Sequence, residues 1–317
     1  MNKDDSGFRW GPFEIHGEKP WPLRIQQLGG SVYYPYDYHP RRTKISHGPC
    51  DADLSKPIIM KGNHFDAFTH ARDLGLAEWY YWDNCLIPQL MYRNAANPHG
   101  DKDWTRLVYR STAPSEITAT DSELAQHLSR VNETIRRISS GAKSSLWDIL
   151  DVKPVTVRGT RILVCLSAQL TISRWYNENL ADLRHKIESW AQARGYTVEY
   201  REKLARNQRT GTRSLTHQLL NEDYRFVVCT HSASALEVLA TGTPVVSLGA
   251  EAAHSLNTPW SKMLNDELTL ATEDDVRGQI LRILTTVWHK QELLTGDWSL
   301  SYNRQCQQPY TKWQLYD

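Results

Sequence analysis

Apolar residues follow two alternating patterns along the second half of this 317-residue chain. Short apolar runs bounded by turn residues predict buried strands at residues 161–166, 197–200, 226–229 and 244–248. Amphipathic stretches predict helices at residues 179–194, 214–220, 234–240 and 272–288. Strands that alternate with helices at this spacing indicate a parallel sheet with helices on both faces.

The first half mixes turn residues with aromatic residues, and its pattern is less regular. A strand, helix, strand unit is predicted at residues 57–60, 65–74 and 79–82, as in a parallel sheet. A further helix is predicted at residues 122–139 from an apolar stripe made by Leu124, Leu128, Val131 and Ile135.

The polar connector at residues 151–159, which contains Pro154, marks the expected domain boundary. We therefore expect an α/β protein with two Rossmann-like domains that face a cleft. The expected divisions are residues 1–155, residues 156–285 and a terminal segment at residues 286–317.

Composition narrows the class of protein. The formal net charge is +1, so any nucleic-acid surface must be local rather than global. Five cysteines without a CxxC pair indicate reduced thiols and no zinc site. Neither an apolar signal segment nor an apolar run of membrane-spanning length occurs. We expect a cytoplasmic protein, a monomer or homodimer, with no membrane partner.

The stretch FVVCTHSASALEVLATGTPVVSLG, residues 226–249, gathers polar side chains between a predicted strand and a predicted helix. Such a junction lies at the carboxyl edge of a parallel sheet, where helix N–H groups bind anions. One interpretation is that Ser232 or Ser234 only caps the helix, with Glu237 completing a capping box. The other is a diphosphate at the helix N-terminus, with Glu237 accepting a hydrogen bond from a ribose hydroxyl.

The run THSASALEVLATGTPVV resembles the S-x-A-x-E-x-x-x-x-G-x-P-V segment of GT-B glycosyltransferases. The matched positions are Ser232 or Ser234, Ala235, Glu237, Gly242, Pro244 and Val245. The resemblance implies a GT-B fold whose second domain binds a nucleotide-sugar donor, with a UDP-sugar favoured and no bound metal or permanent cofactor. It also implies that the terminal segment packs back on the first domain. The implied donor contacts in this run are Thr230, His231, Ser232, Ala233, Ser234 and Glu237.

Three more residues of the second half are candidate donor contacts. Ser167 follows the first strand of that half, and Arg201 and Lys203 follow the next. A hydroxyl or a basic side chain at the carboxyl end of a strand is well placed to bind phosphate. The alternatives are a polar turn at Ser167 and a solvated basic run at Arg201 and Lys203.

The first half resembles the N-terminal region of phage-encoded glycosyltransferases that modify 5-hydroxymethylpyrimidine bases in DNA. The segment KGNHFDAFTHARDLGLAEWYYWDN, with YRNA after it, carries the matches at Asp83, Asn84, Tyr92, Arg93 and Asn94. Cys85 and the inserted IPQLM depart from that pattern. The resemblance implies a double-stranded DNA acceptor in a host cytoplasm. The expected phosphate contacts are Arg41, Arg42, Lys44 and Arg93.

Sugar transfer to a hydroxyl requires a stabilised leaving diphosphate, and an inverting enzyme also requires a general base. Asp83 is the first candidate base, followed by His64 and Asp66, although Asp83 and His64 are also consistent with capping roles. Three alternatives stay open. They are a GT-B enzyme acting on a small molecule or cell-surface glycan, a sugar-nucleotide epimerase, and a non-catalytic module that binds nucleotide or DNA.

Overall fold

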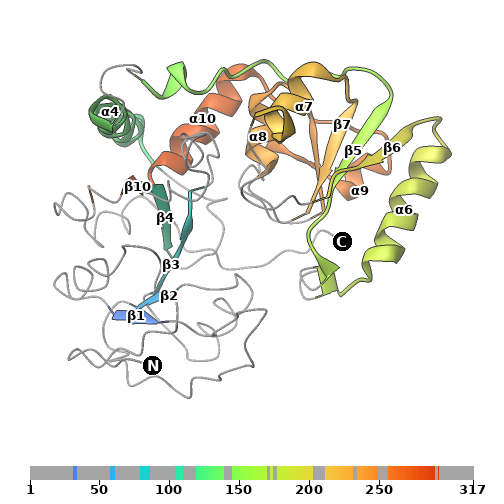
Figure 1. The fold of residues 1–317 in the computed structure, drawn as a ribbon, viewed down its shortest axis with the longest axis horizontal. Helices are drawn as coiled ribbons and strands as arrows, with labels where there is room; N and C mark the ends of the chain where they lie inside the picture. The colour runs from blue at the N-terminus through green and yellow to red at the C-terminus, as the bar shows by residue number, and fades with distance from the viewer. Residues whose placement is uncertain are drawn as a thin grey trace. The chain divides into compact units, whose positions relative to one another are not determined.

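The computed structural model describes two units of the chain, which are treated separately (Figure 1). Its described residues are 31–33, 58–60, 79–85, 104–109, 119–138, 145–169, 172–173, 177–202, 211–230, 234–248, 256–289 and 292. Of these, Cys85 and residues 121–284 belong to the second unit, and the others belong to the first.

The described strands of the second unit form a five-stranded sheet in the order β6-β5-β7-β8-β9. All neighbouring pairs are parallel, so the predicted parallel α/β sheet is confirmed for this unit. The strands are β5 (Arg161–Cys165), β6 (Thr197–Tyr200), β7 (Phe226–Cys229), β8 (Val245–Ser247) and β9 (Thr258–Pro259).

Helices follow most of these strands, as the alternating pattern predicts. They are α6 (Leu180–Gln192), α7 (Leu215–Asn221), α8 (Ser234–Ala240), α9 (Trp260–Met263) and α10 (Glu273–Leu284), with short 3-10 turns η1 (Leu146–Asp148) and η3 (Gly211–Arg213). The helix predicted to reach residue 288 ends at Leu284, because Val287–His289 forms a strand instead. Within the described residues, no helix has both the length and the apolar character that a bilayer crossing requires.

Successive side chains along each strand point to opposite faces of this sheet, and both faces are packed. Ile162 and Val164 of β5 pack in a buried cluster with Ile187 and Trp190 of α6 and Met263 of α9. The residues between them in each strand point to the opposite face, where α8 contacts β7 and β8 and α7 contacts α8. Helices therefore cover both faces and leave the strand ends to carry polar chemistry.

The described strands of the first unit form a sheet in the order β1-β2-β3-β4-β10. They are β1 (Ser31–Tyr33), β2 (Ile58–Met60), β3 (Trp79–Asn84), β4 (Trp104–Tyr109) and β10 (Val287–His289). β1, β2 and β3 are parallel, whereas β4 and β10 are antiparallel to their neighbours. The sheet is therefore mixed rather than wholly parallel. The helix predicted at residues 65–74 lies outside the described residues.

Helix α4 (Asp121–Ile138) belongs to the second unit, although the boundary expected near residue 155 assigns it to the first domain. It contacts α10 and η1, and Asn132 Oδ1 accepts a hydrogen bond from Leu146 N at 2.8 Å. Burial lowers the pKa of His127 to about 3, and the charge of Arg130 acts in the same direction. The His127 ring is therefore neutral at pH 7, which suits its buried position.

Gly242 ends the turn after α8 with a left-handed backbone, φ 80°. Its carbonyl accepts from Thr156 N at 2.9 Å, and Ala240 O accepts from Lys153 N at 3.1 Å. A Cβ at position 242 would lie 2.8 Å from Pro154 O. The connector and this turn therefore approach each other too closely for any side chain.

We expect Gly242→Ala to lower the free energy of unfolding by about 3 kcal/mol, because backbone strain and a clash with backbone add together. Gly195→Ala is the matched control, since Gly195 also has a positive φ, 70°, but a Cβ there meets nothing within 4 Å. The control should lose about 1 kcal/mol. Urea unfolding measures both, and equal losses would contradict the close approach.

Candidate functional site

The side of the second sheet on which the chain adds strands reverses between β5 and β7. From β5 the chain adds β6 on one side, and then β7, β8 and β9 on the other. This is the 2-1-3-4-5 order of a doubly wound sheet, in which ligands bind beyond the carboxyl ends of the strands that flank the reversal. The first candidate site is therefore the carboxyl ends of β5 and β7.

Ser167 and Thr230 stand at those two strand ends and are hydrogen-bonded to each other. Thr230 Oγ1 accepts from Ser167 N at 2.6 Å and donates to Ser167 Oγ at 2.9 Å. Thr230 is fully buried, whereas Ser167 is half-buried. Because the Thr230 hydroxyl donates to Ser167 Oγ, the hydrogen of Ser167 points away from Thr230. The pair therefore leaves the Ser167 hydroxyl able to donate to another group.

Ser234 begins α8, and its Oγ lies 3.9 Å from Cys229 Sγ at the end of β7. Glu237, one turn further along α8, is half-buried. Its Oε1 accepts from Thr216 N at 3.1 Å and from Thr216 Oγ1 at 2.6 Å. Glu237 thus binds the first turn of α7, a contact that the sequence did not predict. The three predicted donor contacts His231, Ser232 and Ala233 lie outside the described residues.

Arg201 follows β6 and is half-buried. Its Nη1 donates to Gln218 Oε1 at 2.5 Å, and its Nη2 donates to the carbonyl of Arg213 at 2.5 Å. A guanidinium has five N–H donors, so these bonds do not exhaust it. Lys203, its predicted neighbour at the donor, lies outside the described residues.

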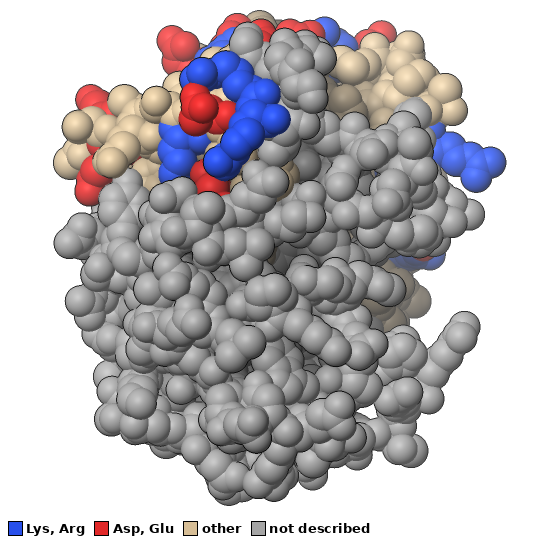
Figure 2. All heavy atoms as spheres, turned by 60° about the vertical axis from the view of Figure 1, so that its left-hand side comes forward, with Lys and Arg blue, Asp and Glu red and all other residues tan. Residues whose placement is uncertain are grey.

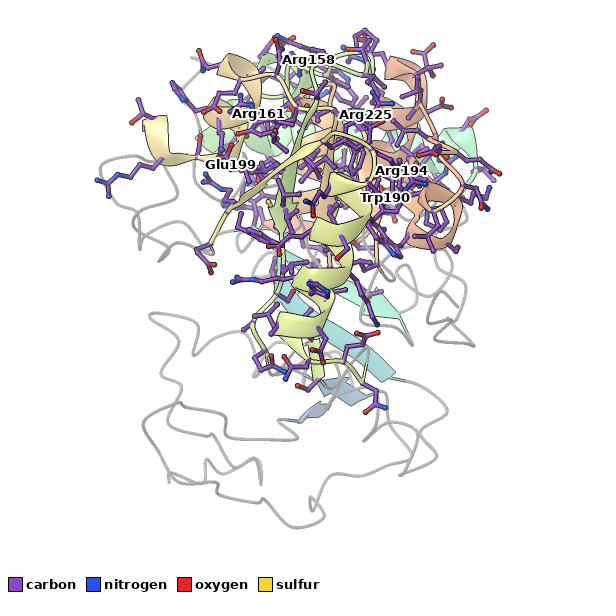
Figure 3. The ribbon with its side chains drawn as sticks, turned by 90° about the vertical axis from the view of Figure 1, so that its right-hand side faces the viewer. Arg158, Arg161, Trp190, Arg194, Glu199 and Arg225 are labelled. Carbon is purple, nitrogen blue, oxygen red and sulfur yellow. The ribbon has the colours of Figure 1, made fainter. Side chains whose placement is uncertain are left out.

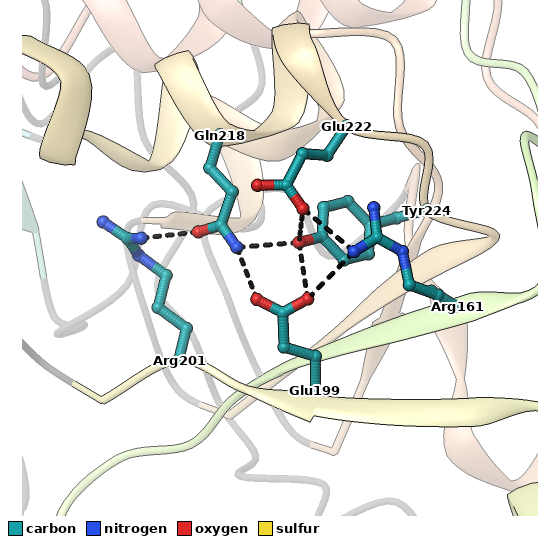
Figure 4. A network of polar contacts seen from close by, with 6 residues as sticks. All are labelled: Arg161, Glu199, Arg201, Gln218, Glu222 and Tyr224. Carbon is teal, nitrogen blue, oxygen red and sulfur yellow. Dashed lines mark hydrogen bonds and ion pairs between the residues drawn. The ribbon is translucent and has the colours of Figure 1, made fainter.

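Beside Arg201 a polar network joins α7 to the strands (Figure 4). Gln218 Nε2 donates to Glu199 Oε1 at 2.8 Å and to Tyr224 Oη at 2.7 Å. Arg161 Nη1 lies 3.4 Å from Glu199 Oε2 and 3.0 Å from Glu222 Oε2. These contacts fix the orientation of the Gln218 amide, because a carboxylate accepts hydrogen bonds and does not donate them.

Tyr224 is the buried centre of the network. Its hydroxyl lies 2.9 Å from an oxygen of Glu199 and 2.9 Å from an oxygen of Glu222. It has one hydrogen, so it donates to one carboxylate at a time. Burial raises the pKa of Tyr224, and the hydrogen bond to Glu199 raises it further.

Arginines near the start of the strands pack on rings (Figure 3). Arg194 lies 4.5 Å from the centre of the Trp190 ring and donates to Asp266 Oδ1 at 2.7 Å. Arg225 lies 4.7 Å from the centre of the Tyr196 ring. Cation–π packing and ion pairing give these arginines a structural role, away from the carboxyl edge.

On the face in Figure 2, Lys and Arg lie next to Asp and Glu within the described part of the surface. Pairs such as Arg136–Glu133 at 2.8 Å and Lys153–Asp151 at 3.6 Å have this mixed character. The residues predicted to bind DNA lie outside the described residues, and they are Arg41, Arg42, Lys44 and Arg93. The described residues contain no group of three or more His, Cys, Asp or Glu that could hold a metal ion.

Asp83 lies within β3, one residue before its end, and stands opposite Arg106 of β4 in register. Arg106 is 2% exposed. The role of Asp83 as a base stays a prediction. The other candidates, His64 and Asp66, lie outside the described residues.

No family model and no curated protein matches this chain. Among solved structures, it is similar to KpsC of Thermosulfurimonas dismutans, a beta Kdo 2,7 transferase, at 12% identity and a TM-score of 0.36. That match covers 70% of this chain and 75% of the other.

We expect Thr230→Val to lower the free energy of unfolding by about 2 kcal/mol, because it leaves the Ser167 N–H without its acceptor. Thr230→Ser keeps the hydroxyl and should recover most of this loss. Urea unfolding of the three proteins provides the measurement. A valine variant as stable as the serine variant would show that the bond between β5 and β7 contributes little.

The raised pKa of Tyr224 predicts a loss of stability at high pH. Below the ordinary tyrosine pKa of about 10 its contribution is fully present, whereas above it the unfolded chain loses a proton that the folded chain keeps. The free energy of unfolding should then fall by up to about 1.4 kcal/mol per pH unit from this group. Unfolding at pH 8 to 11 should give a shallower fall in Tyr224→Phe. Parallel curves for the two proteins would contradict the assignment.

Proposed function

We propose that this protein is a glycosyltransferase that moves a sugar from a nucleotide-sugar donor to a hydroxyl group. The observation that carries the proposal is the Ser167–Thr230 pair at the reversal of a doubly wound parallel sheet. The GT-B-like motif follows directly in the chain, with Ser234 and Glu237 on α8. A strand edge with a hydroxyl donor at Ser167 suits a diphosphate, and a carboxylate on the following helix suits a ribose.

In the proposed reaction, the donor diphosphate binds at the carboxyl ends of β5 and β7. Ser167 Oγ donates to a phosphate oxygen, and Arg201 contributes further N–H donors and positive charge. Donors fixed by the fold stabilise the charge that develops on the leaving diphosphate as the glycosidic bond breaks. Glu237 accepts from the ribose and so selects a nucleotide over simpler phosphates.

For the acceptor, we propose the hydroxymethyl group of a modified pyrimidine in double-stranded DNA. The support is the resemblance of the segment around Asp83 and the basic residues Arg41, Arg42, Lys44 and Arg93 in the first half. A base inside a duplex is out of reach of an active site, so it would be flipped out of the stack. Phosphate contacts through lysine and arginine would make binding weaken as salt rises.

Asp83 is the proposed base that takes the proton from the acceptor hydroxyl. The backbone register places Asp83 opposite Arg106, so a role as counter-charge is the alternative that a test has to separate from catalysis. Loss of a base lowers the rate, whereas loss of a counter-charge to a buried arginine lowers stability.

A panel of sugar nucleotides, offered with hydroxymethylated and unmodified duplex DNA and with a small glycan, tests the proposal. We expect release of nucleoside diphosphate and a mass gain on the hydroxymethylated nucleoside only. A gain on the glycan alone would refute the DNA acceptor and keep the transferase. Conversion of the sugar nucleotide without transfer would indicate an epimerase, and no turnover of any donor would indicate a binding module.

Variants separate the proposed roles. Glu237→Ala should raise KM for the donor about tenfold or more, because it removes an acceptor that the bound nucleotide uses. Asp83→Asn should lower kcat by at least about a hundredfold with little change in donor KM, because it removes the base. Steady-state kinetics measure both.

Asp274 is an exposed acidic residue of α10, so Asp274→Ala is the control for the loss of a carboxylate. Thermal unfolding of Asp83→Asn accompanies the kinetics. A strong loss of stability with rate retained in the folded fraction would assign Asp83 to Arg106 rather than to catalysis.

A further inference from the structure

Helix α7 lies between two of the proposed donor contacts and bonds to both. Thr216 binds Glu237 of α8, and Gln218 binds Arg201 beyond β6. Neither Thr216 nor Gln218 follows a sheet strand, so neither occupies a position where ligands of such sheets bind directly. Their hydrogen bonds go instead to Glu237 and Arg201, the residues proposed to contact the donor.

Thr216 holds the Glu237 carboxylate with a matched pair of donors. The backbone N–H and the hydroxyl of Thr216 both reach Oε1, at 3.1 and 2.6 Å. A hydroxyl at this distance makes a charge-assisted bond, which is among the stronger hydrogen bonds in proteins. The two contacts restrict the rotation of a flexible glutamate. A carboxylate has about four acceptor positions, more than the two that Thr216 occupies.

Gln218 holds Arg201 in a similar way. Its amide N–H groups donate to Glu199 and Tyr224, so its carbonyl oxygen faces the guanidinium of Arg201 (Figure 4). Arg201 Nη2 bonds in turn to the carbonyl of Arg213. The guanidinium thus has two contacts that set its direction, one to Gln218 of the buried network and one to the Arg213 carbonyl.

The helix that carries both residues is itself firmly held. Leu215 and Leu219 are 8% and 0% exposed, and Ser214 caps the first turn by accepting from His217 N at 3.0 Å. Arg158 Nη2 donates to the carbonyl of Leu219 at 3.4 Å. A short helix fixed at both ends is a rigid support for the two side chains that it presents.

We propose that Thr216 and Gln218 are positioning residues, which hold Glu237 and Arg201 in the geometry that binds the nucleotide of the donor. This inference rests on the proposed function, because it concerns the same donor site. Neither residue touches the donor itself. Their effect is to reduce the side-chain freedom that donor binding would otherwise have to restrict.

The test is steady-state kinetics of Thr216→Val, which removes the hydroxyl and keeps the shape and the backbone N–H. We expect KM for the donor to rise about fivefold to tenfold with kcat within about twofold, because one of two bonds to Glu237 is lost. Thr216→Ser restores the hydroxyl and should restore KM. A purely structural role would lower the stability of the variant, and would not raise donor KM alone in a folded variant that keeps kcat.

His217 is an exposed residue of the same helix, so His217→Ala is the control. This variant should leave the donor KM unchanged. Gln218→Leu should also raise donor KM, by release of Arg201. Thermal unfolding identifies any loss of the fold in each variant. An unchanged donor KM in folded Thr216→Val would overturn the inference. The proposed function would still stand, as long as the wild-type protein turns over a donor. Absence of turnover in the wild-type protein, with every donor, would overturn both.

Discussion

The parallel pairing of β5 with β7 is the contact on which the second unit depends. Residues 162–165 of β5 pair with residues 226–229 of β7 in the middle of the sheet. The two strands run parallel, although β6, which lies between them in sequence, pairs with the other side of β5. Both strands therefore end at the same edge, and the residues that follow them meet there. Ser167 and Thr230 are neighbours for that reason, although 63 positions separate them.

Burial and polarity are divided along the same strands. Ile162, Val164, Phe226 and Val228 fill one side of the sheet with apolar volume, and their hydrophobic burial is the main stabilising contribution. Polar groups are concentrated at the strand ends and under α7, where each finds a partner. The network around Tyr224 is a polar support for α7, since its carboxylates, amide and guanidinium satisfy one another.

The sequence predicted the second sheet well because its strands are short apolar runs between clear turns. The antiparallel pair in the first unit was missed. β4 has an arginine in its centre, Arg106, and such a residue conceals the apolar pattern of a strand. β10 was absorbed into the predicted helix, since Val287 and Trp288 continue the apolar residues of α10 without an intervening glycine or proline. Pairing with β4, a contact distant in sequence, decides its conformation.

The site was predictable only in part. Strand ends are visible in a sequence, so Ser167, Arg201 and Thr230 could be named, whereas Thr216 and Gln218 lie in a helix, away from any strand end, and carry no local signal. The close approach at Gly242 has a different consequence, one for evolutionary comparison. Because Pro154 O would lie 2.8 Å from a Cβ at position 242, a related chain with a side chain there must route its connector differently. Glycine at position 242 is then a signature of the relatives that keep this connection between connector and turn.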